Sequence, residues 1–550
     1  MPVQNPPAGS LEKRERGPNI LLITTDEERA RLPVAPGYSL PARERLGEAG
    51  LSFDGYRVTT GMCSPSRSVI YAGQHTVKTG VTDNDNFPSI AGLPLDMPTL
   101  GTMLRAAGYY TAYKGKFHLQ GGDLYLDPST VADARTEDAL EPFGFSDFNT
   151  WGDIDGGAWA GLRIDPVIAG DAAAWLRNRA PVVKGDQPWF LAVNFVNPHD
   201  IMSFDFGGTP GGDLPDFIAK GFVTRPPAPV PLYASQWDVE LPATIDEDLS
   251  TKPPFQTGLK DSIDFLFGRV PDDDWWRAGL SFYLNCIRDV DRSVSLVLDA
   301  LAATGQADET VVIFTSDHGE MIGSHGLRQK LGLVYDENVR VPLIIRHPDV
   351  PGGGRTSQVA SSIDLAPTLL DIAGVDTAEV ATHFPDLHGH SLLPALTGDA
   401  TGRDGALATG ESVFGLDPAF FPSLAEPGGQ EKLLNGQLKP DWTRRSFLRG
   451  ICDDRYSFGR YFSPLEYNRP TTVDELLADN DVELYDRHDD PDEANNLAHD
   501  PASRNLLATM LDKLESLIDA EIGDDTRSVV LDQVGAAIAP PGWHGDVSPA

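Results

Sequence analysis

Predominantly apolar runs, often rich in β-branched residues, are the strongest pattern along this sequence. They cover residues 18–25, 188–196 and 309–316, and shorter runs cover 51–53 and 341–346. Runs of this kind, without alternating polar positions, are typical of strands that are buried on both faces of a parallel sheet. Each of the three long runs therefore predicts a central strand.

Ionisable residues follow all three long runs. Asp26 and Glu27 come after the first, and His199 comes after the second. Asp317 and His318 come after the third. Open α/β sheets bind their ligands beyond the carboxyl ends of the strands, so we expect these side chains to share one site. The alternatives are a helix cap or surface charge for Asp26 and a hydrogen-bonded loop residue for His199.

Apolar residues at helical spacing occupy the intervals between the strands. The clearest stretches are 98–107, 165–179, 283–304 and 361–373. Strands that alternate with helices predict an α/β fold in which helices flank a mostly parallel sheet.

The last third of the chain has a different pattern. Alternating residues at 446–461 predict antiparallel strands, and 501–522 predicts a closing helix, whereas 400–440 is typical of a loop-rich connection. We divide the chain into an N-terminal tail (1–17), a large domain (18–430), a C-terminal α+β subdomain (431–525) and a C-terminal tail (526–550). The last segment is a candidate for docking on a second subunit in a homo-oligomer.

The charge of the chain restricts its partners. It has 81 acidic and 44 basic residues among 550, for a formal net charge of -37. Such a chain repels nucleic acid and anionic membranes, so we expect neither as a partner. An anionic substrate would need a local cluster of positive charge.

The cysteines and the N-terminus suggest a compartment. Cys63, Cys286 and Cys452 are too few for a disulfide framework, which favours a reducing environment. The first seventeen residues lack the apolar core of a signal peptide, and no run is long enough to span a membrane. We therefore expect a cytoplasmic protein that does not contact a membrane.

The segment from residue 61 to 73 contains the strongest candidate for chemistry. Cys63 stands where a loop is predicted to enter a helix that Gly73 ends. Pro65 suits the first helical turn, and the unpaired N–H groups there, together with Arg67, favour an anion. The alternative is a buried structural cysteine beside an ordinary helix start.

Two further cations lie close together near residue 117. Lys116 and His118 are two residues apart on a segment predicted to be extended, so both side chains would face the same group. Taken singly, each would be an ordinary surface charge.

Two segments together resemble the sulfatase family. Cys63-Ser64-Pro65-Ser66-Arg67 matches the sulfatase signature Cys-x-Pro-x-Arg. Residues 317–330, which begin with Asp-His-Gly and end in a lysine, resemble the second sulfatase signature. The resemblance extends from residue 18 to about 522, and the order of the motifs is that of the family.

This resemblance implies a fold and a cofactor. The fold would be that of the alkaline phosphatase superfamily, with a mixed, mostly parallel sheet and a small C-terminal domain. The cysteine of a type I sulfatase is oxidised to formylglycine by a separate maturation enzyme, so Cys63 would carry this modification. One divalent metal ion would complete the site; Ca²⁺ is the usual ion, and an imidazole ligand favours Mn²⁺.

The resemblance also implies a role for each residue. The catalytic set would be Cys63, Arg67, Lys116, His118, His199 and Lys330. The metal ligands would be Asp26, Glu27, Cys63, Asp317 and His318. The substrate would contact Asn84, Lys116, His199 and Lys330. The family has Asp-Asp or Asp-Gln at the first strand end and Gly-Lys-Trp-His around the lysine, so Glu27 and Phe117 depart from its pattern.

In this family a hydroxyl of the formylglycine hydrate attacks sulfur, and the alcohol leaves. His199 and Lys330 would protonate the alcohol, and His118 would deprotonate the second hydroxyl as sulfate departs. The expected reaction is therefore hydrolysis of a small-molecule aryl or alkyl sulfate. Two alternatives are a formylglycine-dependent phosphonate monoester or phosphodiester hydrolase and a non-catalytic anion-binding relative.

Overall fold

The computed structural model describes residues 17–85, 90–120, 138–154, 156–185, 187–211, 224–398, 402–411 and 417–538. Almost all of the predicted N-terminal tail and residues 539–550 of the predicted C-terminal tail lie outside these ranges. Within them, no helix combines the length and the apolar character that crossing a bilayer requires.

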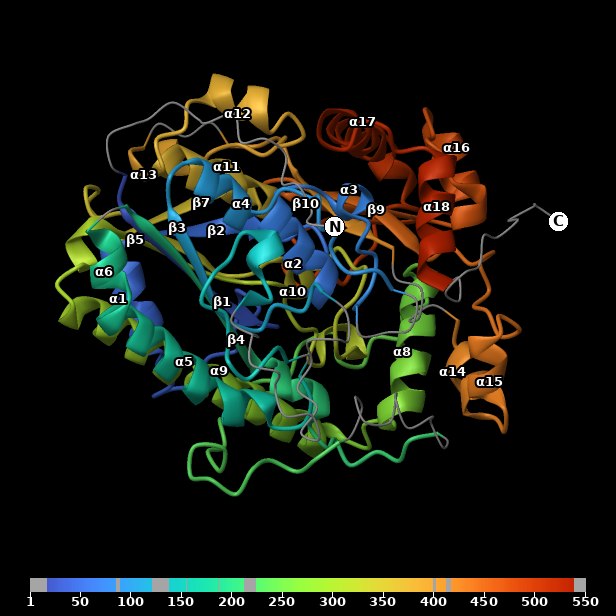
Figure 1. Ribbon diagram of the computed structural model, residues 1–550. Helices are drawn as coiled ribbons and strands as arrows, with labels where there is room; N and C mark the ends of the chain where they lie inside the picture. The colour runs from blue at the N-terminus through green and yellow to red at the C-terminus, as the bar shows by residue number, and fades with distance from the viewer. Residues whose placement is uncertain are drawn as a thin grey trace.

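A seven-stranded sheet forms the centre of the large domain (Figure 1). Its strands, in spatial order, are β3 (Tyr110–Gly115), β4 (Trp189–Pro198), β1 (Asn19–Asp26), β5 (Thr310–Ser316), β6 (Leu343–Arg346), β2 (Leu51–Arg57) and β7 (Gly354–Ser361). Only β6 runs antiparallel to its neighbours in this sheet. The predicted mixed, mostly parallel sheet is therefore confirmed.

The three long apolar runs are the central strands β4, β1 and β5, in which every residue is buried. Their register brings the carboxyl ends together: Asp26 is paired with Pro198, and Thr25 is paired with Ser316. The residues that follow these strands consequently meet at one edge of the sheet.

Helices cover both faces of this sheet (Figure 1). On one face α5 (Ala160–Asn178) and α9 (Asp273–Ala303) pack on β4, and α1 (Pro41–Ala49) packs on α9. On the other face α2 (Cys63–Ala72), α4 (Leu100–Ala106) and α11 (Leu365–Ile372) pack together. Helix α9 begins ten residues before the predicted start at residue 283, because Asp272 caps it there by accepting the N–H groups of Asp274 and Trp275.

The remaining helices lie between these elements or around the small sheet. They are α3 (Thr76–Thr79), α6 (Ala180–Lys184), α8 (Pro254–Phe267), α10 (Asp336–Val339), α12 (Thr377–His383), α13 (Leu393–Leu396), α14 (Phe420–Ala425), α15 (Gly429–Leu434), α16 (Val473–Asp479), α17 (Arg504–Glu521) and α18 (Arg527–Ile538).

A second sheet of four antiparallel strands lies in the C-terminal region. Its strands are β8 (Ala406–Gly410), β9 (Phe447–Cys452), β10 (Tyr456–Phe462) and β11 (Asp481–Asp486). The loop-rich connection predicted for 400–440 is wrong at β8 and at α14 and α15, since short buried elements lack a recognisable period. Helix α18 likewise occupies much of the predicted C-terminal tail. The domain boundary at residue 430 stays a prediction.

A buried carboxylate links the small sheet to α8 and to the segment that ends in Tyr335. Glu483 on β11 accepts hydrogen bonds from Tyr461 (2.8 Å), Tyr485 (2.8 Å) and the side-chain amide of Gln256 on α8 (2.7 Å). Gln256 in turn accepts from the hydroxyl of Tyr335 (2.8 Å). Three donors on one acceptor satisfy a group that would otherwise be expensive to bury. The small sheet is thereby fixed to the segment that ends in Tyr335.

The contact between β3 and β4 predicts a specific glycine requirement. Gly115 has φ +98°, and a methyl group there would overlap the carbonyl oxygen of Asn194 on the paired strand. We expect Gly115→Ala to lower the free energy of unfolding by at least about 3 kcal/mol, measured by chemical denaturation. Gly108→Ala is the matched control, because its φ is +91° but its surroundings are open. Gly108→Ala should lower the free energy of unfolding by only about 1–2 kcal/mol, which is the cost of the strained backbone. Equal losses for the two variants would show that the contact with Asn194 is not the cause.

Candidate active site

Helix α2 places Cys63 at its first position. Met62 before it is extended, and Gly73 ends the helix in the left-handed conformation (φ 68°) that was expected from the sequence. The side-chain oxygen of Asn84 accepts the N–H of Ser64 at 3.1 Å. Asn84 thus satisfies an N–H group at the buried start of the helix from a separate loop, which gives it a structural contact at the position where the sequence predicted a substrate contact.

Arg67 is the buried centre of the site. Its Nη2 lies 2.9 Å from Oδ2 of Asp26, and its Nε lies 2.9 Å from Oδ2 of Asp317. Its Nη1 donates to the carbonyl oxygen of Lys116 at 2.9 Å. One guanidinium therefore ties the ends of β1 and β5 to the loop after β3, a geometry that the planar fork of arginine suits and lysine does not.

Lys116 and His118 both lie at the site, but not for the reason that the sequence suggested. Strand β3 ends at Gly115, and His118 has φ +57°, so the segment is not extended as predicted. Lys116 Nζ lies 2.8 Å from Asp26 Oδ2, whereas His118 Nε2 lies 3.4 Å from Oδ1 of Asp85. The turn directs the two side chains to different carboxylates.

Three side chains converge on a position suited to a metal ion. His318 Nε2 lies 3.6 Å from Oδ1 of Asp26 and 3.7 Å from Oδ1 of Asp317. Neighbouring ligands of a Ca²⁺ ion at about 2.4 Å would be about 3.4 Å apart at right angles, so these separations fit a coordination shell. His318 Nδ1 lies 3.0 Å from the carbonyl oxygen of Gly319, which can only accept. Nδ1 therefore carries the proton, and Nε2 offers its lone pair to the cluster.

Cys63 faces the same cluster. Its Sγ lies 3.2 Å from His318 Nε2 and 3.8 Å from Asp26 Oδ1. Burial, and then the charge of Asp26, raises the pKa of the Cys63 thiol to about 11. The unmodified side chain is therefore a neutral thiol near neutral pH, not a thiolate nucleophile.

Glu27 belongs to a second group of possible ligands, which it forms with Asp26 and His199. Its Oε2 lies 2.6 Å from Nζ of Lys330, and its Oε1 is buried without a hydrogen-bond partner. Burial raises the pKa of Glu27, Lys330 lowers it, and nearby Glu320 raises it again. The structure thus places Glu27 beside the cluster of Asp26, Asp317 and His318 and ties it to Lys330.

His118 and His199 are neutral in this arrangement. Burial, followed by the positive charge of Lys116, lowers the pKa of both His118 and His199 well below the usual value. Burial alone would raise the pKa of Asp26, but the positive charges of Lys116 and Arg67 hold it well below its usual range. The site therefore combines an ionised carboxylate with neutral imidazoles that can accept protons.

The comparison with protein families settles the affiliation. Residues 18–375 match the Sulfatase family. The chain belongs to the sulfatase family. It is a sulfuric ester hydrolase with the fold of the alkaline phosphatase superfamily.

Several named sulfatases are similar to this sulfatase over most of its length. A choline-sulfatase of Rhizobium meliloti is 28% identical over 407 residues, which are 69% of this chain and 72% of the relative. A Delta 4,5-hexuronate-2-O-sulfatase of Bacteroides thetaiotaomicron is 26% identical over 533 residues, which are 95% of this chain and 93% of the relative.

Solved structures share the fold. A 2-O GAG sulfatase covers 93% of this chain with a TM-score of 0.64 and 24% identity, and 94% of its own chain is covered. A phosphonate monoester hydrolase from Silicibacter pomeroyi covers 92% with a TM-score of 0.62 and 23% identity, and 96% of its own chain is covered. The sulfatase therefore shares its fold with a phosphonate monoester hydrolase.

Sequence analysis missed several residues that shape this sulfatase site. Asp153 accepts the N–H groups of Phe117 and His118, both at 2.8 Å, and Glu320 accepts those of Ile322 and Gln329. These carboxylates hold the turns that carry His118 and Lys330. Both bind backbone groups, and such contacts leave no local motif; Asp153 also lies in an irregular stretch.

The buried arginine predicts a large effect on stability. Arg67→Met would remove the arginine partner of the buried Asp317 and one of the two cationic partners of the buried Asp26, so we expect the free energy of unfolding to fall by about 3–5 kcal/mol. For Arg67→Lys we expect a smaller fall in the free energy of unfolding. Some fall should remain, because an ammonium cannot bridge both carboxylates. The control is Arg45→Met, since Arg45 pairs with Asp299 on the surface and should contribute below about 1 kcal/mol. Similar losses at both positions, measured by urea denaturation, would contradict the assigned role.

Proposed function

We propose that this sulfatase hydrolyses a small-molecule sulfate monoester with a formylglycine made from Cys63. The observation that supports this most is the position of Cys63 Sγ, which lies within 4 Å of both His318 and Asp26 and carries a raised thiol pKa. A neutral thiol is a poor nucleophile and a poor ligand for a hard cation. An oxygen at the same position would suit both tasks.

The modification would supply a geminal diol at residue 63, with one hydroxyl to attack sulfur and a second whose deprotonation releases sulfate and restores the aldehyde. A separate maturation enzyme would be its partner in the cell. The N–H of Ser64 is already held by Asn84, which fixes the first turn of α2 and with it the direction of residue 63.

Asp26, Asp317 and His318 would hold one divalent cation, which would supply positive charge beside the substrate oxygens. Carboxylate oxygens suit Ca²⁺, and the imidazole of His318 suits Mn²⁺ better. Arg67, Lys116 and Lys330 balance Asp26, Glu27 and Asp317 in charge, so a bound dication would leave the site positive and ready for an anion.

The remaining side chains would act on the substrate. Lys116 and Lys330 would face the sulfate oxygens, and His118 would accept a proton as sulfate departs. His199 has a buried Nδ1 without a partner, and its lowered pKa describes the site before an anion enters. A bound anion would raise that pKa and allow His199 to protonate the leaving alcohol.

A phosphonate monoester or phosphodiester is the second candidate substrate. The observation that favours it is the imidazole donor His318 in the metal cluster, since family members with Asp-His at this position include such hydrolases. The fold shared with a phosphonate monoester hydrolase is consistent with it. A non-catalytic relative is a weaker alternative, because the sequence has Cys63, Arg67, Lys116, His118, His199 and Lys330 together.

The decisive measurement joins the mass of the peptide that contains Cys63 with parallel turnover of an aryl sulfate and an aryl phosphonate. With a maturation enzyme supplied, we expect the mass loss of thiol-to-aldehyde conversion and faster release of sulfate than of phosphonate. Cys63→Ser should form a sulfated enzyme that turns over at least about 10³-fold more slowly. Modification with preferential phosphonate hydrolysis would select the second candidate, and an unmodified, inactive protein would select the non-catalytic relative.

Metal binding makes a separate prediction about stability. Ca²⁺ or Mn²⁺ at about 100 times its Kd should stabilise the chelator-treated protein by about 2.7 kcal/mol, which is measured as a higher melting temperature. Asp317→Asn should abolish this shift, whereas Asp308→Asn, at a fully exposed carboxylate, should retain it. A shift that survives Asp317→Asn would place the metal elsewhere.

A further inference from the structure

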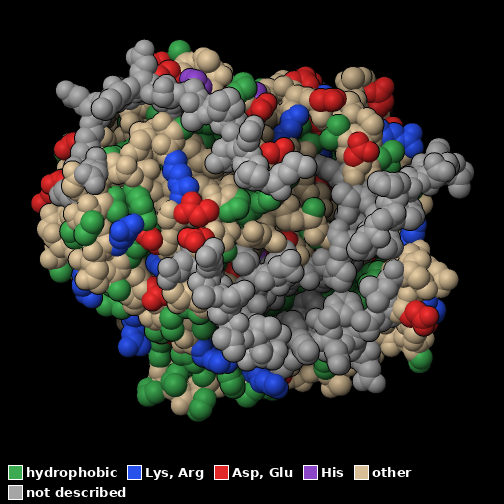
Figure 2. Space-filling view, in the orientation of Figure 1, with side chains coloured by type: hydrophobic (Ala, Val, Ile, Leu, Met, Phe, Trp, Pro, Cys, Tyr) green, Lys and Arg blue, Asp and Glu red, His purple; other side chains and the backbone are tan. Residues whose placement is uncertain are grey.

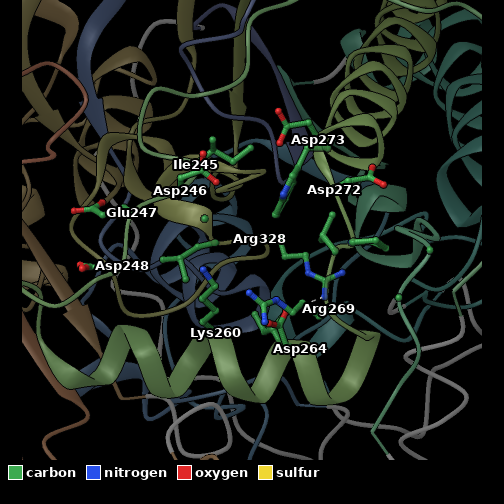
Figure 3. Close-up of a pocket in the computed structure, with 18 of the residues that line it drawn as sticks. Ile245, Asp246, Glu247, Asp248, Lys260, Asp264, Arg269, Asp272, Asp273 and Arg328 are labelled. Carbon is green, nitrogen blue, oxygen red and sulfur yellow. Dashed lines mark hydrogen bonds and ion pairs between the residues drawn. The ribbon is translucent and has the colours of Figure 1, made fainter.

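A cavity of about 890 Å³ lies between α8, the segment 245–248, the start of α9 and the segment 326–328 (Figure 3). Three cations line it: Lys260, Arg269 and Arg328. Lys330 is only two residues from Arg328, but its ammonium contacts Glu27 in the catalytic site. The segment 328–330 therefore places one cation in the cavity and another in the catalytic site.

Arg328 is the buried member of the three, with 5% of its surface exposed. Its Nη2 donates to the carbonyl oxygen of Gly268 and lies 3.3 Å from Oδ1 of Asp264. The guanidinium also lies 5.2 Å from the ring centre of Phe206. These contacts fix its orientation, yet burial still lowers its pKa because Asp264 offsets the loss of water only in part.

Lys260 and Arg269 have no carboxylate of their own. In the part of the chain that the structure describes, neither forms an ion pair, and both act with Arg328 on the single carboxyl of Asp264. Figure 3 shows Lys260 and Asp264 on α8 along one side of the cavity, with Asp272 and Asp273 across from them. Among the groups that line the cavity, Arg328 is buried, Lys260 and Asp264 are half-buried and Arg269 is exposed.

The other acids that line the cavity are committed elsewhere or lie at its mouth. The carboxylate of Glu247 contacts His325 at 2.6 Å and Lys252 at 3.2 Å. Asp272 accepts N–H groups at the start of α9, and Asp248 accepts the N–H of Ser250 at 2.8 Å. Asp246 and Asp273 are exposed at the rim. None of these five forms an ion pair with the three cations.

We propose that this cavity is a second anion site, which binds a sulfate or carboxylate group between Lys260, Arg269 and Arg328. A planar guanidinium in a fixed position, with two further cations in the same cavity, suits an oxyanion. Binding would also compensate the buried charge of Arg328, which Asp264 leaves under-neutralised. The site does not depend on the chemistry proposed for Cys63.

The anion has two possible sources with the same chemistry. It is either free inorganic sulfate, the product of the enzyme class, or a second anionic group on the substrate. The exterior is strongly acidic overall, and Figure 2 shows carboxylates and cations interspersed over the described residues of one face. A local group of cations in a cavity can thus bind an anion although the chain as a whole repels it.

Inorganic selenate, a heavier analogue of sulfate, is the probe. We expect crystals of the full chain soaked in selenate to show an anomalous peak between Lys260, Arg269 and Arg328. The double variant Lys260→Met/Arg269→Gln should lose this peak and bind selenate at least tenfold more weakly at this site by calorimetry. The control Lys432→Met/Arg444→Gln removes two exposed cations away from the cavity and should bind as the wild type does. Absence of the peak, or equal binding by both double variants, would overturn the proposal.

Steady-state kinetics then separate the two sources. The test compares an aryl sulfate with an aryl sulfate that carries a distant carboxylate. If the substrate supplies the anion, Lys260→Met/Arg269→Gln should raise KM at least fivefold for the second compound only. If free sulfate is the ligand, KM should change for neither compound while selenate binding is still lost. A fall in kcat for both, with selenate binding intact, would show that these cations serve only the local structure.

Discussion

The ion-pair network of Arg67 is the constraint on which the site depends. Arg67 lies on α2, while its partners Asp26 and Asp317 end two adjacent parallel strands. All three side chains are fully buried, so none tolerates the loss of another. The position of Cys63, one helical turn before Arg67, follows from this contact. The positions of Cys63, Asp26 and Asp317 are thus set by the same interaction.

Sequence patterns predicted the centre of the fold because β1, β4 and β5 are apolar throughout and end in ionisable residues. The same logic placed Asp26, Asp317 and His318 at one sheet edge. It failed for β8, a five-residue strand without a clear period, and for the extended conformation around Lys116. It also could not show that Glu27 pairs with Lys330, because that contact joins residues 303 positions apart.

The distribution of charge explains how an acidic protein can serve anionic ligands. The formal net charge of the chain is -37, whereas Arg67, Lys116 and Lys330 are buried against matching carboxylates. Each buried cation keeps its charge because a carboxylate lies beside it. Screening by salt weakens the repulsion of the exterior more than these short buried contacts. Anion affinity therefore depends on local geometry and not on net charge.

The carboxylate of Glu483 connects the small sheet to the segment that carries Lys330. Tyr461 and Tyr485, both on that sheet, share Glu483 with Gln256, and Tyr461 also lies 3.1 Å from the carbonyl oxygen of Gly332. Gly332 is two residues after Lys330. A chain shortened to residues 18–375, the region that matches the family, would keep every catalytic side chain but lose the wall behind the Lys330 segment. The segment that carries Lys330 therefore depends for its packing on residues outside the region that matches the family.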